Sequence, residues 1–353
     1  MSDSIAKKLS TLDRFLPLWI FLAMAFGLGL GRSWPGLGAV LDQVKVDTVS
    51  LPIAVGLLWM MYPVLAKVRY GELHHLAARG KMIGLSLTFN WLIGPVVMFA
   101  LAWLFLPDLP HYRTGLVLIG LARCIAMVLI WNLLACGSNE LAAVLVALNS
   151  LFQILFYSLL GWLFISVIPT WLGIGGAAFH VSMGAIAKSV AIFLGVPLVA
   201  GALTRFVLVR RRGEDWYETV FLPRLGPTAL FGLLYTIVLM FAMQGDKILA
   251  HPLDVLRIAA PLLIYFAVIF VSAFLAARKL GCTYEETAAV AFTAAGNNFE
   301  LAIAVAVGVF GISSGEALAG VVGPLIEVPA LIALVYLALW LRRWLWPAER
   351  ERK

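Results

Sequence analysis

The sequence predicts an all-α polytopic membrane protein with ten transmembrane helices, arranged as two inverted five-helix repeats. Three observations indicate this fold class: an unusually apolar composition, ten apolar runs separated by polar loops, and a match between the two halves. Of the 353 residues, 62% are hydrophobic and 13% are charged, with a mean hydropathy of +0.97. Soluble domains have about 45–50% apolar and about 25% charged residues. The composition therefore disfavours a soluble enzyme, a disordered chain and a nucleic-acid-binding module.

We interpret ten apolar runs as membrane-spanning helices, since a crossing takes about 20 residues and ten crossings would use most of the sequence. The runs are Leu16–Leu30, Leu51–Ala66, Met82–Leu106, Thr114–Ala135, Leu141–Ile168, Ser189–Val209, Leu225–Met243, Ile258–Ala277, Thr287–Phe310 and Ala317–Trp340. The first 14 residues are polar and lead directly into the first run, so the first helix can act as an uncleaved insertion signal.

Positive charge divides unequally between the two sides that these runs define. The termini and the loops on their side, with the adjoining span ends, hold 19 of the 26 Lys and Arg residues, whereas the opposite loops hold 5. The positive-inside rule then places both termini in the cytoplasm. We expect a multi-pass protein of the cell (inner or plasma) membrane, in which the net charge of +7 reflects topology and no nucleic-acid partner.

The two halves match at one constant offset of 174 residues. Residues 122–153 read ARCIAMVLIWNLLACGSNELAAVLVALNSLFQ, and residues 296–327 read GNNFELAIAVAVGVFGISSGEALAGVVGPLIE. Polar positions coincide in this register, with Gln153 meeting Glu327. Because five is odd, the halves enter the membrane in opposite orientations. We predict one integrated transporter domain made of a first five-span repeat (residues 1–168), an extracytoplasmic connection (169–182) and a second five-span repeat (183–353).

Inverted repeats of this kind build secondary transporters, with the binding site at mid-membrane where broken helices of the two halves meet. The second half shows such a break at Gly296-Asn297-Asn298, a run of low helix propensity whose amides can cap exposed chain ends. In the first half, only Gly120 and the charge of Arg123 indicate an interruption.

Polar side chains inside a span are costly, so each needs a structural or functional reason. The two matching segments contain the candidate substrate-binding residues, which are Arg123, Cys124, Asn149, Gln153, Asn297, Asn298 and Glu300. Glu300 and Glu327 are the candidates for proton coupling, because an acid in a low-dielectric site can exchange a proton in the physiological range. The alternatives are a structural ion pair between Glu300 and Arg123, and a helix-packing hydrogen bond from Glu327.

Cys124 is the candidate ligand for a soft metalloid or metal ion. A cationic neighbour such as Arg123, or a helix N-terminus, favours a thiolate, and a thiolate is a soft ligand. A single thiol can release a cargo that three thiolates would trap. Cys136 and Cys282 lie near the cytoplasmic side, and the three cysteines give no disulfide framework.

Catalytic and cofactor motifs are missing from the sequence. The five histidines fall in loops or at span ends, so no Cys-His pair for an intramembrane hydrolase is available at depth, and the sequence has no P-loop. We therefore expect a non-enzymatic protein without a cofactor.

The motifs resemble a known family. The segment ARCIAMVLIWNLLACGSNELAAVLVALNSLFQ, the segment AFTAAGNNFELAIAVAVGVFG with VVGPLIEVPALIALVY, and PIAVGLLWMMYPVLAKV in the second span are similar to the arsenite efflux permeases (arsenical-resistance transporters) of the bile acid/arsenite/riboflavin transporter superfamily. The resemblance covers essentially the whole chain.

This resemblance implies ten spans with discontinuous, crossing fourth and ninth helices. It also implies export of trivalent arsenic, often antimonite too, in exchange for protons, which confers arsenical resistance. The family's essential cysteine in span 4 matches Cys124, and its essential acid in span 9 matches Glu300. The expected partners are arsenite, protons and the lipid bilayer. Whether a soluble arsenic chaperone or ATPase docks on the loops is left open.

Two other functions are consistent with parts of the sequence. A sodium-coupled symporter of organic anions could use the same fold, with a carboxylate and crossing carbonyl groups as sodium ligands. It would not need a lone thiol at the crossing. A membrane ligand sensor or receptor belongs to a different class, and the short loops with no soluble output domain argue against it.

Overall fold

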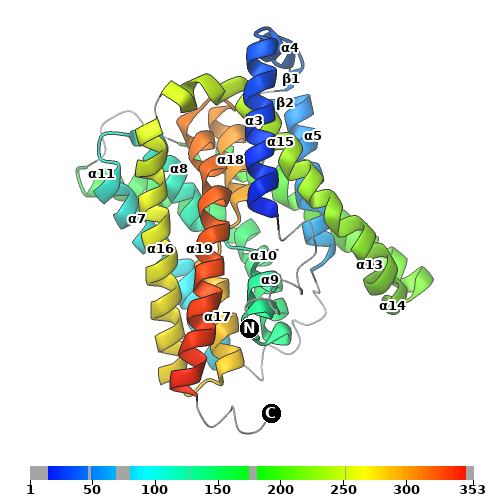
Figure 1. The fold of residues 1–353 in the computed structure, drawn as a ribbon, viewed down its shortest axis with the longest axis vertical. Helices are drawn as coiled ribbons and strands as arrows, with labels where there is room; N and C mark the ends of the chain where they lie inside the picture. Colours follow the sequence, from blue (N-terminus) through cyan, green and yellow to red (C-terminus); the bar gives the residue numbers. More distant parts are fainter. Residues whose placement is uncertain are drawn as a thin grey trace.

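The computed structural model describes residues 15–46, 49–68, 80–125, 127–174, 181–250 and 252–346, and these residues are mostly helical (Figure 1). The first half contains α3 (Leu16–Ser33), α4 (Leu37–Gln43), α5 (Leu51–Ala66), α6 (Gly80–Thr88), α7 (Gly94–Phe105), α8 (Pro110–Leu121), α9 (Met127–Leu134), α10 (Asn139–Trp162) and α11 (Ile168–Trp171). A two-residue hairpin between α4 and α5 pairs β1 (Lys45–Val46) antiparallel with β2 (Val49–Ser50).

The second half contains α12 (Met183–Val190), α13 (Val196–Arg212), α14 (Glu214–Trp216), α15 (Leu222–Ala250), α16 (Pro252–Lys279), α17 (Tyr284–Ala295), α18 (Phe299–Phe310) and α19 (Gly315–Leu345). The two predicted cytoplasmic ends (residues 1–14 and 347–353) and residues 175–180 of the predicted connection lie outside the described residues.

Long apolar helices dominate the described part of the chain. Six of them have the length and composition to cross a membrane: Gly80–Phe105, Asn139–Trp171, Met183–Arg212, Glu214–Met243, Leu253–Lys279 and Gly315–Leu345. Each predicted span falls on a described helix or on a pair of helices. Large apolar side chains, among them Phe26, Leu104 and Phe206, are exposed on the outside, as expected of a surface that faces lipid. The chain is therefore a polytopic helical membrane protein, whereas the count of ten crossings stays a prediction.

Four of the long helices contain a π-helical turn that ends two residues before a proline. These turns are η2 (Phe89–Ile93), η3 (Leu163–Val167), η4 (Ala191–Gly195) and η5 (Tyr217–Phe221), and the prolines that follow them are Pro95, Pro169, Pro197 and Pro223. Proline has no N–H to donate and its ring clashes with the preceding turn. A wider turn relieves that clash, so the helices continue across the proline.

The helices pack as two groups that lie side by side in Figure 1. The outer group is α3, α5, α13 and α15, in which α15 packs against both α3 and α5, and α13 packs against α5. The crossing group contains α7 to α10 and α16 to α19, with α16 packed against α17 and α19, and α18 packed against α19. The candidate site lies where the crossing group faces the outer group.

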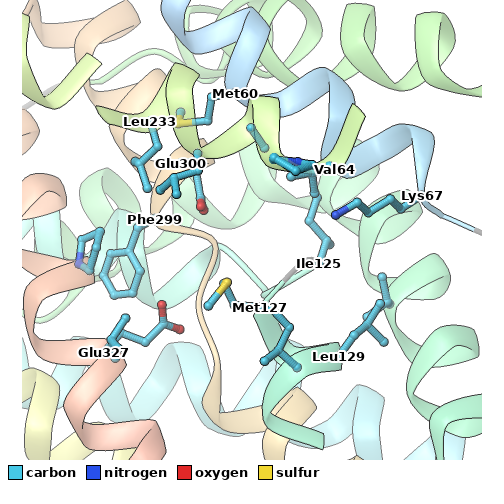
Figure 2. Close-up of a pocket in the computed structure, with 18 of the residues that line it drawn as sticks. Met60, Val64, Lys67, Ile125, Met127, Leu129, Leu233, Phe299, Glu300 and Glu327 are labelled. Carbon is cyan, nitrogen blue, oxygen red and sulfur yellow. The ribbon is translucent and has the colours of Figure 1, made fainter. Parts of the chain in front are cut away.

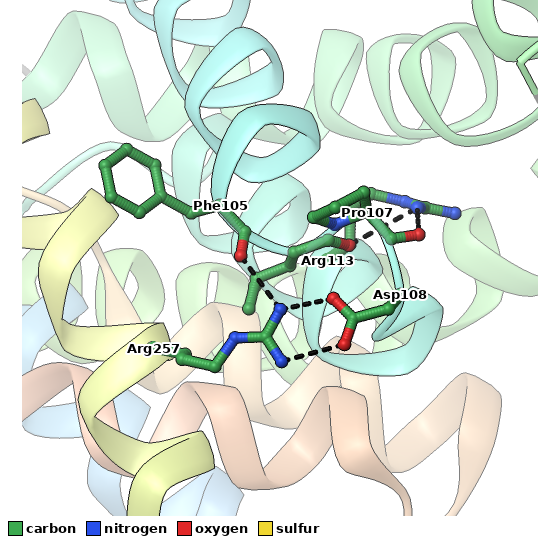
Figure 3. Close-up of polar contacts among 6 residues, drawn as sticks. Phe105, Pro107, Asp108, Arg113 and Arg257 are labelled. Atoms are coloured by element: carbon green, nitrogen blue, oxygen red, sulfur yellow. Dashed lines mark hydrogen bonds and ion pairs between the residues drawn. The ribbon is translucent and has the colours of Figure 1, made fainter.

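An ion pair fixes the turn between α7 and α8 to the start of α16. The Arg257 guanidinium binds both carboxylate oxygens of Asp108 and donates to the carbonyl of Phe105 at 3.2 Å (Figure 3). Arg113 donates to the carbonyl of Pro107 at 3.0 Å. The bond from Arg257 holds the pKa of Asp108 at about 2, below its ordinary value of 3.8. The outer end of the α7–α8 connection is thereby anchored to the neighbouring span.

Candidate functional site

Two interrupted helices meet at the centre of the molecule. Residues 122–125 separate α8 from α9, and residues 296–298 separate α17 from α18. The two interruptions pair as an antiparallel bridge centred on Arg123 and Asn297. In this bridge the N–H of Cys124 donates to the carbonyl of Gly296 at 3.2 Å, and the N–H of Asn298 donates to the carbonyl of Ala122 at 3.0 Å. Backbone groups that leave the helices are thus satisfied by the other segment.

Gly296 allows this close approach. A Cβ atom at this position would lie 2.9 Å from the Cβ of Cys124, which is closer than packed side chains tolerate. Gly323 in α19 also allows a close approach, because a Cβ there would lie 1.8 Å from the Phe299 ring. Gly296 in the second break and Gly323 in α19 therefore both allow close contact between segments.

One polar side chain holds each interrupted segment. Gln153 in α10 accepts the N–H of Arg123 at 3.0 Å through its Oε1 atom. Glu327 in α19 accepts the N–H of Asn297 at 3.3 Å through its Oε1 atom. Both pairs are separated by 30 residues, and the 174-residue offset maps one pair onto the other. The two contacts are equivalent in geometry and differ in that only Glu327 is ionisable.

The second half-helices, α9 and α18, are capped from inside the interruptions. The Cys124 Sγ atom accepts the N–H of Val128 in the first turn of α9, at 3.3 Å. The Asn298 Oδ1 atom accepts the N–H of Leu301 in α18, at 3.0 Å. The expected capping by amides of the second break is therefore confirmed for Asn298. Cys124 is 3% exposed, so its sulfur faces protein, not lipid.

The Arg123 side chain is fully buried and points toward α16 and α17. Its Nη1 atom donates to the Tyr265 hydroxyl at 2.8 Å and to the carbonyl of Ala294 at 3.4 Å, whereas Nε and Nη2 have no hydrogen-bond partner. Within the described residues, Arg123 forms no ion pair with Glu300. The structural ion pair considered from the sequence is therefore not formed.

The other amides of the candidate set lie around the same crossing. Asn297 donates through Nδ2 to the carbonyls of Ile119 at 2.8 Å and Ala122 at 3.2 Å, at the end of α8. Gln153 donates through Nε2 to the carbonyl of Asn149 at 3.3 Å. The Nδ2 atoms of Asn149 and Asn298 are buried without a hydrogen-bond partner, so each remains available to a polar ligand.

A cavity of about 340 Å³ lies between the crossing group and the outer group (Figure 2). Its wall is largely apolar, and the ionisable side chains that line it are Glu300, Glu327 and Lys67. Figure 2 shows the carboxylates of Glu300 and Glu327 pointing into this space. The lining residues include the C-terminal end of α5, the N-terminal half of α9 and the N-terminal end of α15.

The predicted site residues divide into two layers. Glu300 and Glu327 line the cavity directly, whereas Cys124, the amides and Arg123 lie at the crossing behind its wall. Ile125 and Phe299, the chain neighbours of Cys124 and Asn298, form part of that wall. These two residues are also related by the 174-residue offset.

Several residues near the site were not predicted. Lys67, Met60 and Met127 line the cavity, and Tyr265 binds Arg123. A lysine at the end of the second apolar run could have been noticed for its charge. The methionines lie within apolar runs and Tyr265 lies within the eighth, where such residues are ordinary core components.

The fold and the site define a class of protein. Two broken helices that exchange backbone hydrogen bonds beside a cavity with two acidic residues, in a polytopic membrane protein, are the arrangement of a secondary transporter.

Comparison with known proteins identifies the family. A family model described as the sodium bile acid symporter family matches residues 54–251. An arsenical-resistance protein Acr3 of Corynebacterium glutamicum is 53% identical over 342 residues, which cover 97% of this chain and 92% of that protein. An arsenical-resistance protein Acr3 of Alkaliphilus metalliredigens is 32% identical over 356 residues, covering 98% and 97%. A transporter of Synechocystis, slr0944, is 37% identical over 358 residues, covering 95% and 91%.

The chain belongs to the sodium bile acid symporter family and, within it, to the arsenite efflux permeases that the sequence motifs resembled. It is therefore a multi-pass membrane protein of a transporter family.

Proposed function

We propose that the protein exports trivalent arsenic, as arsenite, from the cytoplasm in exchange for protons and thereby confers arsenical resistance. Antimonite is a second cargo. In this proposal the ten spans form two inverted repeats with both termini in the cytoplasm, and the broken helices α8–α9 and α17–α18 are the fourth and ninth spans. The observation that carries the proposal is a cavity with two carboxylates whose wall adjoins a buried cysteine at the crossing.

The direction of the cavity supports an inward-facing state. Its lining includes the C-terminal end of α5 and the N-terminal end of α15, which adjoin the second and sixth loops. These loops lie on the side to which the positive-inside rule assigns the cytoplasm. In this proposal a cytoplasmic solute enters the cavity from this end and reaches Glu300 and Glu327.

Cys124 binds the metalloid covalently. Arsenous acid is uncharged at neutral pH and carries three hydroxyl groups. The thiol of Cys124 loses its proton and forms an S–As bond, while one hydroxyl group leaves the arsenic and takes that proton to become water. The helix N-terminus that donates the Val128 N–H to the sulfur favours the attacking thiolate. Release is the reverse step, in which water displaces the thiol.

The remaining hydroxyl groups are held by the polar side chains of the crossing. Glu300 accepts a hydrogen bond from one As–OH group as a carboxylate. The Nδ2 atoms of Asn149 and Asn298 are buried without partners and supply donors for the cargo oxygens. Ile125 and Phe299 move aside to admit the cargo, because they form the wall in front of these groups.

Coupling follows from the acids, because the membrane potential exerts no force on a neutral cargo. Glu300 enters the inward-facing state protonated and gives its proton to the cytoplasm when the cargo binds. Facing outward, it takes a proton from outside as the cargo leaves, and the protonated protein returns. Glu327 also binds and releases a proton in this cycle, and its protonation changes its hydrogen bond with the N–H of Asn297.

A sodium-coupled organic-anion symporter is not favoured. Two of the similar proteins carry the name arsenical-resistance protein, and an organic anion has no use for a thiol at the crossing.

Everted membrane vesicles provide the test, because their cytoplasmic face is outside. Wild-type vesicles should take up arsenite when their lumen is acidic, and sodium should have no effect. Cys124→Ser should abolish uptake, whereas Cys136→Ser and Cys282→Ser should retain it as matched thiol controls. Glu300→Gln should remove the dependence on the pH gradient.

Full arsenite uptake by Cys124→Ser vesicles contradicts thiol coordination. Uptake by Glu300→Gln that still follows the pH gradient contradicts the assignment of Glu300 as proton carrier. Uptake driven by sodium instead of protons supports the organic-anion type of coupling.

A further inference from the structure

Two thioether sulfurs line the cavity in addition to its carboxylates. Met60 belongs to α5 of the outer group and Met127 begins α9 of the crossing group, so the two methionines stand on opposite sides of the space between the groups. Figure 2 shows both side chains at the cavity, with the Met127 sulfur directed into it. Met127 lies three residues beyond Cys124 in the chain.

The chemistry of the wall makes these sulfurs distinct from ordinary packing. Methionine often fills gaps in a core, and that use requires no open space. Here the thioethers border a cavity of about 340 Å³, whose remaining wall is mostly aliphatic and whose acids are Glu300 and Glu327. Aliphatic groups offer a metalloid no lone pair, whereas a thioether is a soft, polarisable donor.

We propose that Met60 and Met127 form a thioether subsite that contacts the arsenic or antimony atom on its way to Cys124. The subsite rests on the proposed function, since it serves the same cargo. Each sulfur donates a lone pair to the metalloid without losing a proton or breaking a bond, so the contact is reversible. Antimony is the larger and softer atom, and it depends on the thioethers more strongly than arsenic does.

The position of the two sulfurs gives the subsite a role in transport. Met60 is 1% exposed and belongs to α5 of the outer group, whereas Met127 belongs to α9 of the crossing group. A cargo held between them contacts both groups before it is transferred to Cys124. The subsite therefore affects capture of cargo from the cytoplasm more than the later covalent step.

The test compares Met60→Leu, Met127→Leu and the double variant with wild type in proteoliposomes. Leucine keeps the volume and removes the sulfur, which cores generally tolerate. The matched control is Met61→Leu, because Met61 adjoins Met60, is equally buried and does not line the cavity. Initial rates of arsenite and antimonite flux give KM and kcat separately. Equilibrium dialysis of each metalloid against the purified protein gives the Kd.

We expect each cavity variant to raise the antimonite KM about threefold to tenfold with little change in kcat, which corresponds to about 0.7–1.4 kcal/mol of binding. The arsenite KM should rise less, and Met61→Leu should leave both unchanged. Unchanged KM and Kd for both metalloids in the double variant overturn the subsite while the proposed function stands. A wild-type protein that neither binds nor transports either metalloid refutes the proposed function itself.

Discussion

Replacement of Gly296 by alanine tests whether the close contact of the two interrupted segments holds the site together. The new Cβ would lie 2.9 Å from the Cβ of Cys124 and 3.4 Å from the carbonyl oxygen of Phe292. The distance to Phe292 is an ordinary contact, but the Cβ of Cys124 is too close and cannot swing away, because it is the first atom of that side chain. The segments must therefore separate, which stretches the bond from the Cys124 N–H to the Gly296 carbonyl.

The expected loss of stability is the sum of two effects, overpacking at the new Cβ and weakening of one hydrogen bond. Overpacking of a tight interior costs about 1–3 kcal/mol, and weakening one hydrogen bond of the bridge adds about 1 kcal/mol. We expect Gly296→Ala to lower the free energy of unfolding by about 2–4 kcal/mol. For a chain of 353 residues, this lowers the melting temperature by about 3–5 °C.

Thermal unfolding of the purified protein and arsenite uptake by everted vesicles are the measurements. We expect both the melting temperature and the uptake to fall. Gly184→Ala in α12 is the control, because a Cβ there meets nothing within 4 Å. Replacing a helical glycine by alanine in open space raises the free energy of unfolding by about 0.5–1 kcal/mol, so this control should be at least as stable as wild type. Wild-type stability and uptake in Gly296→Ala would refute the claim that the crossing requires this contact.

Three further outcomes follow from other parts of the structure. Cys136 adopts a left-handed conformation (φ 58°), so Cys136→Gly should stabilise the protein by about 1 kcal/mol in thermal unfolding and leave uptake unchanged. Glu327→Gln keeps an acceptor for the Asn297 N–H and should fold normally. Glu327→Leu leaves that N–H unpaired and should lower the free energy of unfolding by about 1–3 kcal/mol. Equal melting temperatures of the two variants would contradict this expectation. Asp108, whose pKa of about 2 lies below its ordinary 3.8, stabilises the folded state above about pH 4 and less as the pH falls toward 2. Asp108→Asn should therefore lower the melting temperature at pH 7, with a difference from wild type that shrinks between pH 4 and pH 2.

The two helix breaks differ in how far the sequence predicts them. Gly296-Asn297-Asn298 is a poor helix former, and the structure confirms a break there. Residues 122–125 contain no comparable run, since arginine, cysteine and isoleucine all occur in helices. That segment is extended because its backbone bonds to the other segment, with the N–H of Cys124 on the carbonyl of Gly296. Such a long-range contact leaves no local signal.

The residues of the site likewise divide into those with a local signal in the sequence and those without one. Glu300 and Glu327 stand out in an apolar sequence because of their charge, and both line the cavity. Met60 and Met127 carry no such signal and emerge only from the geometry. The sequence also did not predict the direction of the Arg123 side chain. Neighbouring side chains of an extended segment point to opposite sides, so Arg123 and Cys124 face different partners. The Arg123 guanidinium therefore binds Tyr265, while the sulfur of Cys124 receives the N–H of Val128.

Positions related by the 174-residue offset make the same contacts in both halves but carry different side chains, and the proposed roles follow from these differences. Gln153 and Glu327 make the same backbone contact, but only Glu327 can bind a proton. Cys124 and Asn298 both cap a half-helix, but only Cys124 can bind a metalloid. In the proposed mechanism the first half thus supplies the covalent ligand of the cargo, and the second half supplies the proton-binding carboxylates. The antiparallel bridge joins them through backbone hydrogen bonds. We therefore expect a proton that weakens the bond between Glu327 and the N–H of Asn297 to change the geometry at Cys124. Coupling between cargo and proton then requires only that the bridge differ between the two protonation states.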